Sequence, residues 1–116
     1  MTREDLCGLC ESHAGAVAEY PFGPDVRVYK AGGKVFALVP EDGASISLKC
    51  DPALAEILRG RYASITPGYH LNKRHWNTIA MDGAVPAAEI AEMVRHSHEL
   101  IVRSLTKAQR AALERA

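Results

Sequence analysis

The chain has 116 residues, of which 47% are hydrophobic and 24% are charged. Its 14 Lys and Arg residues balance 14 Asp and Glu residues, which argues against a protein that coats nucleic acid through bulk positive charge. The length suits one globular domain, residues 1–116, with a single core. No apolar run approaches the roughly 18 residues of a membrane span and the first residues are polar, so we expect a cytoplasmic protein with no membrane partner.

The first half of the chain predicts one helix followed by three strands. Thr2 and Asp5 resemble a helix capping box, and Gly15 is the expected end of that helix. Two β-rich runs, residues 26–31 and 34–39, are joined by two glycines and therefore predict a two-residue hairpin. Apolar and polar residues then alternate over residues 46–50, as in a strand with one wet face.

The second half predicts a helix, two strands and a long closing helix. Asp51 and Pro52 favour a helix start, and Gly60 is the expected stop. Residues 62–66 and 76–81 have strand character, so the stretch between them becomes a loop that projects outward like a wing. A helix begins at Pro86 with an apolar stripe at helical spacing, and a short basic tail follows it. The predicted order is α-β-β-β-α-β-β-α.

The segment most indicative of function lies in that loop. It brings together aromatic, amide, imidazole and basic side chains, namely Tyr69, His70, Asn72, Lys73, Arg74, His75, Trp76 and Asn77. Residues 57–81 contain no Asp or Glu, so Arg59 and Arg61 join Lys73 and Arg74 as four uncompensated cations. This combination is typical of a surface that contacts a polyanion.

Two interpretations of the segment remain open. In the first, the cations contact phosphates, the asparagines bond base edges or sugar, and Tyr69 and Trp76 stack on an unpaired base or brace the loop. Two to four phosphate contacts would give a salt slope of about −2 to −4, hence weak binding. In the second, the asparagines tie turns and the histidines satisfy buried carbonyls, so the segment is architecture.

Metal binding and catalysis have weaker sequence support. Cys7, Cys10 and His13 recur at three-residue steps on the first helix, a zinc-type ligand set that Cys50 would complete only if its strand met this helix. A buried helix face explains the same residues and is favoured, so we expect no metal or cofactor. His70 and His75 are the best-placed general bases, but no nucleophile elbow, phosphate-binding glycine loop or pair of carboxylates accompanies them, so we expect no enzyme.

Several blocks resemble the MmcQ/YjbR family of small bacterial proteins. They are residues 20–25, residues 30–38 with their double glycine, and residues 69–77. The resemblance implies an α+β fold of two layers, with helices on one face of an antiparallel sheet, related in shape to frataxin-like and secretion-chaperone-like domains. It also implies DNA binding through a double-wing motif. The frataxin-like shape suggests iron, but the acidic residues of the first helix are too few and scattered for a hard cation.

We therefore expect a protein that binds DNA weakly and in a salt-sensitive way through the loop. The alternative is a chaperone-like module that binds a protein partner and no nucleic acid.

Overall fold

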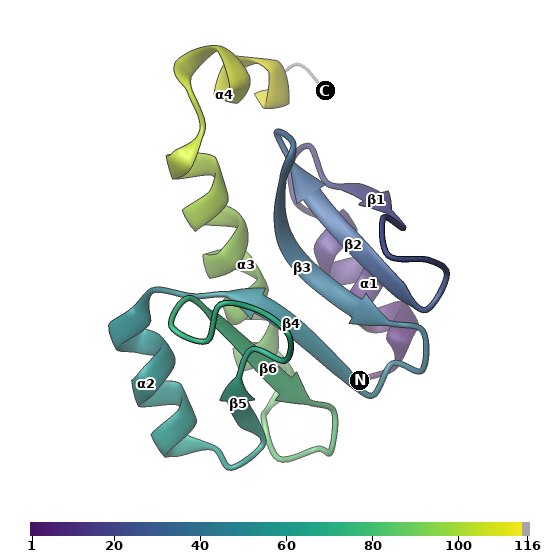
Figure 1. The fold of residues 1–116 in the computed structure, drawn as a ribbon, viewed down its shortest axis with the longest axis vertical. Helices are drawn as coiled ribbons and strands as arrows, with labels where there is room; N and C mark the ends of the chain where they lie inside the picture. The colour runs from purple at the N-terminus through teal and green to yellow at the C-terminus, as the bar shows by residue number, and fades with distance from the viewer. Residues whose placement is uncertain (115–116) are drawn as a thin grey trace.

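The computed structural model describes residues 1–114 as a six-stranded sheet with four helices (Figure 1). In chain order the elements are α1 (Arg3–Glu11), β1 (Val17–Glu19), β2 (Val26–Ala31), β3 (Lys34–Pro40), β4 (Ser45–Lys49), α2 (Pro52–Arg61), β5 (Ile65–Pro67), β6 (Trp76–Ala80), α3 (Ala87–Ser104) and α4 (Lys107–Glu114). The strand order is β1-β2-β3-β4-β6-β5, and all neighbours are antiparallel.

The predicted α+β fold and its order of elements are confirmed. Gly32 and Gly33 join β2 to β3 with φ angles of +60° and +82°, the left-handed conformations that a tight hairpin needs. Thr2 and Asp5 form the reciprocal capping box of α1, with a bond of 3.1 Å from the Asp5 N–H to the Thr2 Oγ1. Asp51 caps α2 by accepting the Leu54 N–H at 3.2 Å.

Several predicted boundaries were wrong, and two short elements were missed. Helix α1 ends at Glu11 instead of Gly15, and α2 continues through Gly60 to Arg61. Strand β5 begins at Ile65, because the Tyr62 N–H still bonds the Leu58 carbonyl and so closes α2. The missed elements are β1 and α4.

Helix α4 replaces the basic tail expected from the sequence. Thr106 and Gln109 cap it reciprocally, with the Gln109 N–H donating to the Thr106 Oγ1 at 3.1 Å and the Gln109 side chain accepting from the Thr106 N–H at 2.8 Å. The Thr-x-x-Gln spacing of a capping box therefore predicts the start of this helix from the sequence.

Helices α1, α2 and α3 pack on one face of the sheet, as the two-layer prediction required. In Figure 1 α1 and α3 lie behind the strands, which leaves the opposite sheet face towards the viewer. The core between the layers includes Leu6, Cys10, Tyr29, Phe36, Val39, Ile46, Ile79, Val94 and Ile101. No helix within residues 1–114 is both long and apolar enough to cross a membrane.

A serine of α3 takes the place of a backbone bond in the middle of the sheet. Only Ala37 with Leu48 and Leu38 with Ser47 pair between β3 and β4, and the strands then diverge (Figure 1). At the next step, the fully buried Ser97 hydroxyl donates to the Phe36 carbonyl at 2.5 Å. It also accepts the Lys49 N–H at 3.0 Å. One hydroxyl thus satisfies both strands where they separate and fixes α3 against them.

We predict that Ser97→Ala lowers the free energy of unfolding by about 2 to 4 kcal/mol, because it leaves a buried N–H and a buried C=O without a hydrogen-bond partner. Urea denaturation measures the change. Ser104→Ala, on the same helix but exposed, should cost less than about 0.5 kcal/mol. Equal losses in the two variants would show that the bridge has no special role.

Candidate nucleic-acid interface

The segment highlighted by the sequence forms a loop between β5 and β6, here called the wing loop (residues 68–75). Its base is closed by the Gly68 N–H, which donates to the Trp76 carbonyl at 2.8 Å. A Cβ atom at Gly68 would lie 2.6 Å from the Trp76 Cβ, so only glycine fits this approach. The Tyr69 N–H then donates to the Thr78 hydroxyl at 3.0 Å, which ties the loop to the sheet.

Asn72 holds the far end of the wing loop by a local turn. Its Oδ1 accepts the N–H groups of Arg74 at 3.0 Å and of His75 at 3.3 Å. The His75 carbonyl in turn accepts the Cys50 N–H at 2.7 Å, next to the start of α2. This is the turn-forming role that the architectural interpretation assigned to asparagine.

Arg59 and Asn77 are also used internally. Asn77 is only 2% exposed, and its Oδ1 accepts the Arg59 Nε–H at 2.7 Å while its amide nitrogen bonds the Ala55 carbonyl at 3.5 Å. The Arg59 guanidinium also donates to the carbonyls of Lys73 and, at 3.2 Å, Trp76. Arg59 therefore fastens the wing loop to α2, and Asn77 cannot reach a ligand without unfolding.

The remaining predicted residues divide between exposed and half-buried positions. Tyr69 is 71% exposed and its ring lies 4.0 Å from the exposed His70 ring, centroid to centroid. Lys73 and Arg74 are exposed, and the Lys73 ammonium lies 3.4 Å from the Gly68 carbonyl. Two further predicted residues, His75 and Trp76, are half-buried. The last, Arg61, is exposed and lies 3.8 Å from a Glu89 oxygen, so its charge is partly compensated.

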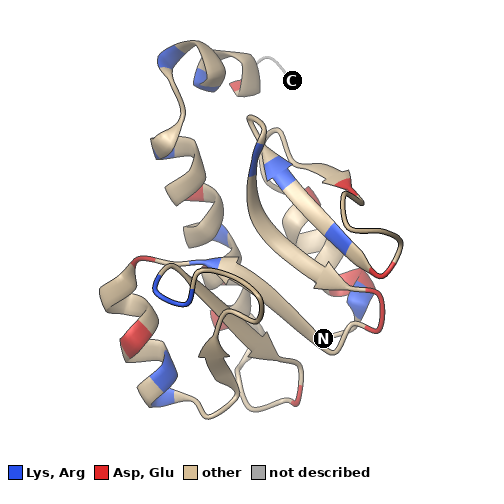
Figure 2. Cartoon of the chain, viewed as in Figure 1, with Lys and Arg blue, Asp and Glu red and all other residues tan. Residues whose placement is uncertain are grey.

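The structure adds one cation that sequence reasoning missed. Lys49, at the end of β4, pairs with Trp76 across the ladder. Strand alternation places its side chain on the open face, because the flanking Leu48 points into the core. Figure 2 shows blue ribbon both in the wing loop and at the nearby end of β4, with no red on the loop. Lys49 lies outside the acid-free window, and only the strand register brings it here.

The cysteines do not form the zinc-type stripe considered above. Because α1 ends at Glu11, His13 leaves the helix and stacks on His98 instead, with ring centroids 4.9 Å apart. Cys7 and Cys10 lie in the core, and burial raises the pKa of Cys10 to about 12. Within residues 1–114 no three His, Cys, Asp or Glu side chains gather as a possible metal site.

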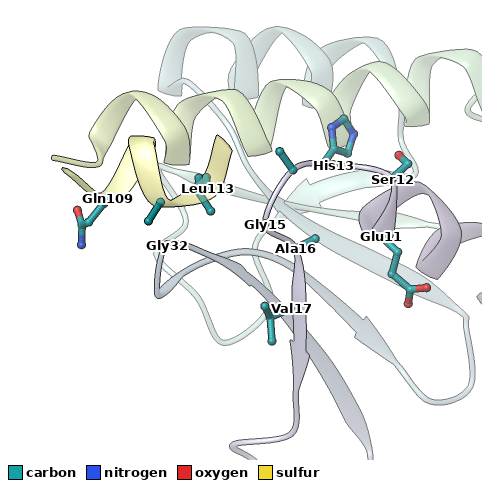
Figure 3. Close-up of a pocket in the computed structure, with 11 residues that line it drawn as sticks. Glu11, Ser12, His13, Gly15, Ala16, Val17, Gly32, Gln109 and Leu113 are labelled. Carbon is teal, nitrogen blue, oxygen red and sulfur yellow. The ribbon is translucent and has the colours of Figure 1, made fainter. Parts of the chain in front are cut away.

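A hollow lies where α4 meets the loop after α1 (Figure 3). Its volume is about 720 Å³, and it is formed mainly by residues 11–17 together with Gly32, Gln109 and Leu113. Leu113 is the contact that docks α4 here, because its side chain occupies the space that a side chain at Gly15 would need. The His98 Nε2 lies 2.8 Å from the Ala14 carbonyl and fixes the same loop to α3.

We predict that Arg59→Met destabilises the protein by on the order of 2 kcal/mol, because three oxygen acceptors at the base of the wing loop lose a charged donor. Arg74→Met is the matched control, and it should change stability by less than about 0.5 kcal/mol. Urea denaturation of both variants measures the difference. Similar losses would mean that Arg59 does not fasten the loop.

We predict a loss of stability on mild acidification that depends on His13. Burial, with the charges of His98 and Arg95, lowers the pKa of His13 below its usual 6.5. The unfolded chain therefore binds this proton more readily, and stability falls as the pH drops through the unfolded pKa. Melting temperatures from about pH 7.5 to about pH 5.5 should fall less in His13→Phe than in the unaltered protein. If the melting temperatures of the two proteins fall equally with pH, His13 is not the group responsible.

The comparisons with known proteins agree with this fold. The chain is 33% identical to the uncharacterised protein YjbR of Escherichia coli K12, over 97% of this chain and 98% of that one. It is 29% identical to the uncharacterised protein YyaQ of Bacillus subtilis, covering 86% and 98%.

Two solved structures have the same fold as this chain. The crystal structure of protein DR2400 of Deinococcus radiodurans superposes with a TM-score of 0.90 at 38% identity, covering 97% of this chain and 88% of that one. A Pseudomonas syringae protein superposes at 0.74 with 27% identity, covering 87% and 99%. The YjbR family model matches residues 11–100, which include all six strands, α2 and most of α3. The chain belongs to the YjbR family.

Proposed function

We propose that the protein binds DNA weakly through a wing face made of Lys49, Tyr69, His70, Lys73 and Arg74, and that its role is binding and not catalysis. The observation that carries the proposal is the set of three cations on and beside the wing loop. No carboxylate of residues 1–114 forms an ion pair with any of them. Other cations, such as Arg95 and Arg103, are paired along α3.

The internal bonds of the wing loop support such a contact. Asn72, Arg59 and Thr78 hold its backbone, so Lys73 and Arg74 project from an ordered frame and lose less entropy when they meet phosphates. The guanidinium of Arg74 matches a phosphate with two parallel donors. The exposed Tyr69 ring offers a face on which an unpaired base can stack.

The same bonds argue for binding with little sequence preference. Both asparagines were expected to bond base edges. Asn77 is buried and cannot do so, and the side-chain oxygen of Asn72 already accepts two backbone N–H groups. Contacts to phosphates position a protein but carry no sequence information. Three phosphate contacts correspond to a salt slope of about −2 to −3, near the lower end of the range expected from the sequence.

We predict that affinity for a short DNA falls about 15- to 60-fold between about 50 and about 200 mM salt, because each contact releases a condensed counterion. The double variant Lys73→Gln/Arg74→Gln should reduce the slope to about −1 and weaken binding at low salt. Fluorescence anisotropy measures both quantities, with a duplex and one of its single strands in separate arms. Tighter binding of the single strand is expected if Tyr69 stacks on bases.

The matched control is Lys107→Gln/Arg110→Gln, which removes the same charge from α4 and should leave the affinity unchanged. An equal effect of the two double variants would show diffuse charge attraction and contradict the wing face. Absence of binding at low salt would overturn the proposal. The edge strand β1, whose three residues are all exposed, would then make a protein-binding role the next candidate.

A further inference from the structure

The open face of the sheet carries a hollow of about 580 Å³ that lies outside the core. It shares Tyr69 and His70 with the wing face but none of the three cations of that face. Its apolar floor is formed by Val26, Leu38 and Pro40, from β2 and β3. Two loops wall it on opposite sides. Phe22 comes from the loop between β1 and β2, and Leu71 belongs to the wing loop. The volume lies within the usual range of sites for small organic molecules, about 300 to 1,000 Å³.

Among residues 1–114, no Lys, Arg, Asp or Glu lines this hollow. A charged ligand would lose its hydration there without gaining an opposite charge, which is costly in free energy. A phosphate backbone is excluded for the same reason, so the hollow is separate in its chemistry from the cations of the wing face. A lining without charged side chains therefore favours an uncharged ligand.

Polar groups that could orient such a ligand are present and unused. Ser45 and His70 line the hollow, and neither side chain has a hydrogen-bond partner among residues 1–114. By contrast Ser47 and Thr78, also in the lining, bond each other at 2.8 Å and anchor Tyr69, which keeps the wall in place. A few free polar groups in an otherwise apolar, preformed cavity are typical of small-molecule sites.

The walls of the hollow hold two features that are unfavourable without a ligand. Phe22 and Tyr69 are 74% and 71% exposed, although such rings are stabilised by leaving water. Moreover, His70 has φ of +58°, and no other non-glycine residue within 1–114 has a positive φ. Left-handed backbone at a non-glycine residue is a strained conformation that concentrates at ligand sites.

We propose that this hollow binds a small, uncharged, largely apolar aromatic molecule, held between Phe22 and Tyr69 and oriented by Ser45 and His70. The ring is placed over the floor of β2 and β3, and a hydrogen-bonding group on it meets the free hydroxyl or imidazole. The hollow and the wing face share Tyr69 and His70, but none of the three cations of the wing face lines the hollow, so removing those charges tests DNA binding separately.

The test uses N-phenyl-1-naphthylamine, an uncharged dye whose fluorescence rises in apolar surroundings. We expect saturable binding to the unaltered protein. Phe22→Ala should weaken it about 5- to 10-fold by removing half of the aromatic clamp, and Ser45→Tyr should weaken it more by filling the hollow. Both positions lie outside the core, and urea denaturation of each variant verifies that it is folded.

The matched control is Ile57→Ala, which truncates an apolar side chain of similar exposure, 62%, on α2. It should bind the dye as the unaltered protein does. The Lys73→Gln/Arg74→Gln variant should also keep full dye binding, which separates this site from the DNA contact.

Charge selectivity is tested with anilinonaphthalene sulfonate, which has the same ring system with an added sulfonate. We expect it to bind at least about 10-fold more weakly than the neutral dye, because its charge has no partner in the hollow. The proposal is overturned if the neutral dye does not saturate or if the anionic dye binds equally well. It is also overturned if Phe22→Ala and Ile57→Ala have equal effects, as they would if a different apolar surface captured the dye.

Discussion

The Ser97 hydroxyl is the contact on which the arrangement of the two layers depends. It stands between Phe36 of β3 and Lys49 of β4, where a direct backbone bond would otherwise continue the ladder. A helix that supplies this bond must lie against the sheet at that point, so α3 is fixed in position as well as packed by its apolar stripe. Helices α1 and α2 join it on the same face, and no helix of residues 1–114 covers the opposite face.

A one-sided sheet explains why both proposed functions use the same face. Antiparallel strands alternate inward and outward side chains, so the outward set must be compatible with water. Here that set is divided. Hydroxyls and apolar groups occupy the centre, and Lys49 with the wing loop supplies positive charge at one end of the β4–β6 ladder. The cations at the rim of this face would therefore attract phosphates, while the apolar centre would bind a ligand by removing apolar surface from water.

Local signals predicted most of the fold, because their physical causes lie within a few residues. The double glycine of the hairpin, the Thr2 and Asp51 caps and the apolar stripe of α3 need no knowledge of the tertiary structure. Strand β1 has only three residues, all exposed, and so had no periodicity to detect. Helix α4 did carry a capping signal in Thr106 and Gln109, which its basic composition obscured.

The candidate site was harder to predict, because function and architecture use the same residue types. Sequence alone could not separate Arg59, which bonds one oxygen of the wing loop and two of β6, from Arg74, which projects freely. The distinction depends on α2 lying beside β6, a contact between segments 18 residues apart. Lys49 became a candidate only through its register with Trp76. The hollow combines Phe22 with Tyr69, which are remote in sequence, and it exists because the twisted sheet holds two loops above its open face.

The internal bonds of the wing loop connect these observations. Asn72 within the loop and Arg59 and Thr78 outside it hold one conformation. That conformation places Tyr69 and His70 at the hollow and Lys73 and Arg74 outside it. A flexible loop with the same composition would present the same charge but no fixed wall. The unusual concentration of polar residues in this segment is therefore explained first by architecture, and the binding surfaces are what that architecture leaves free.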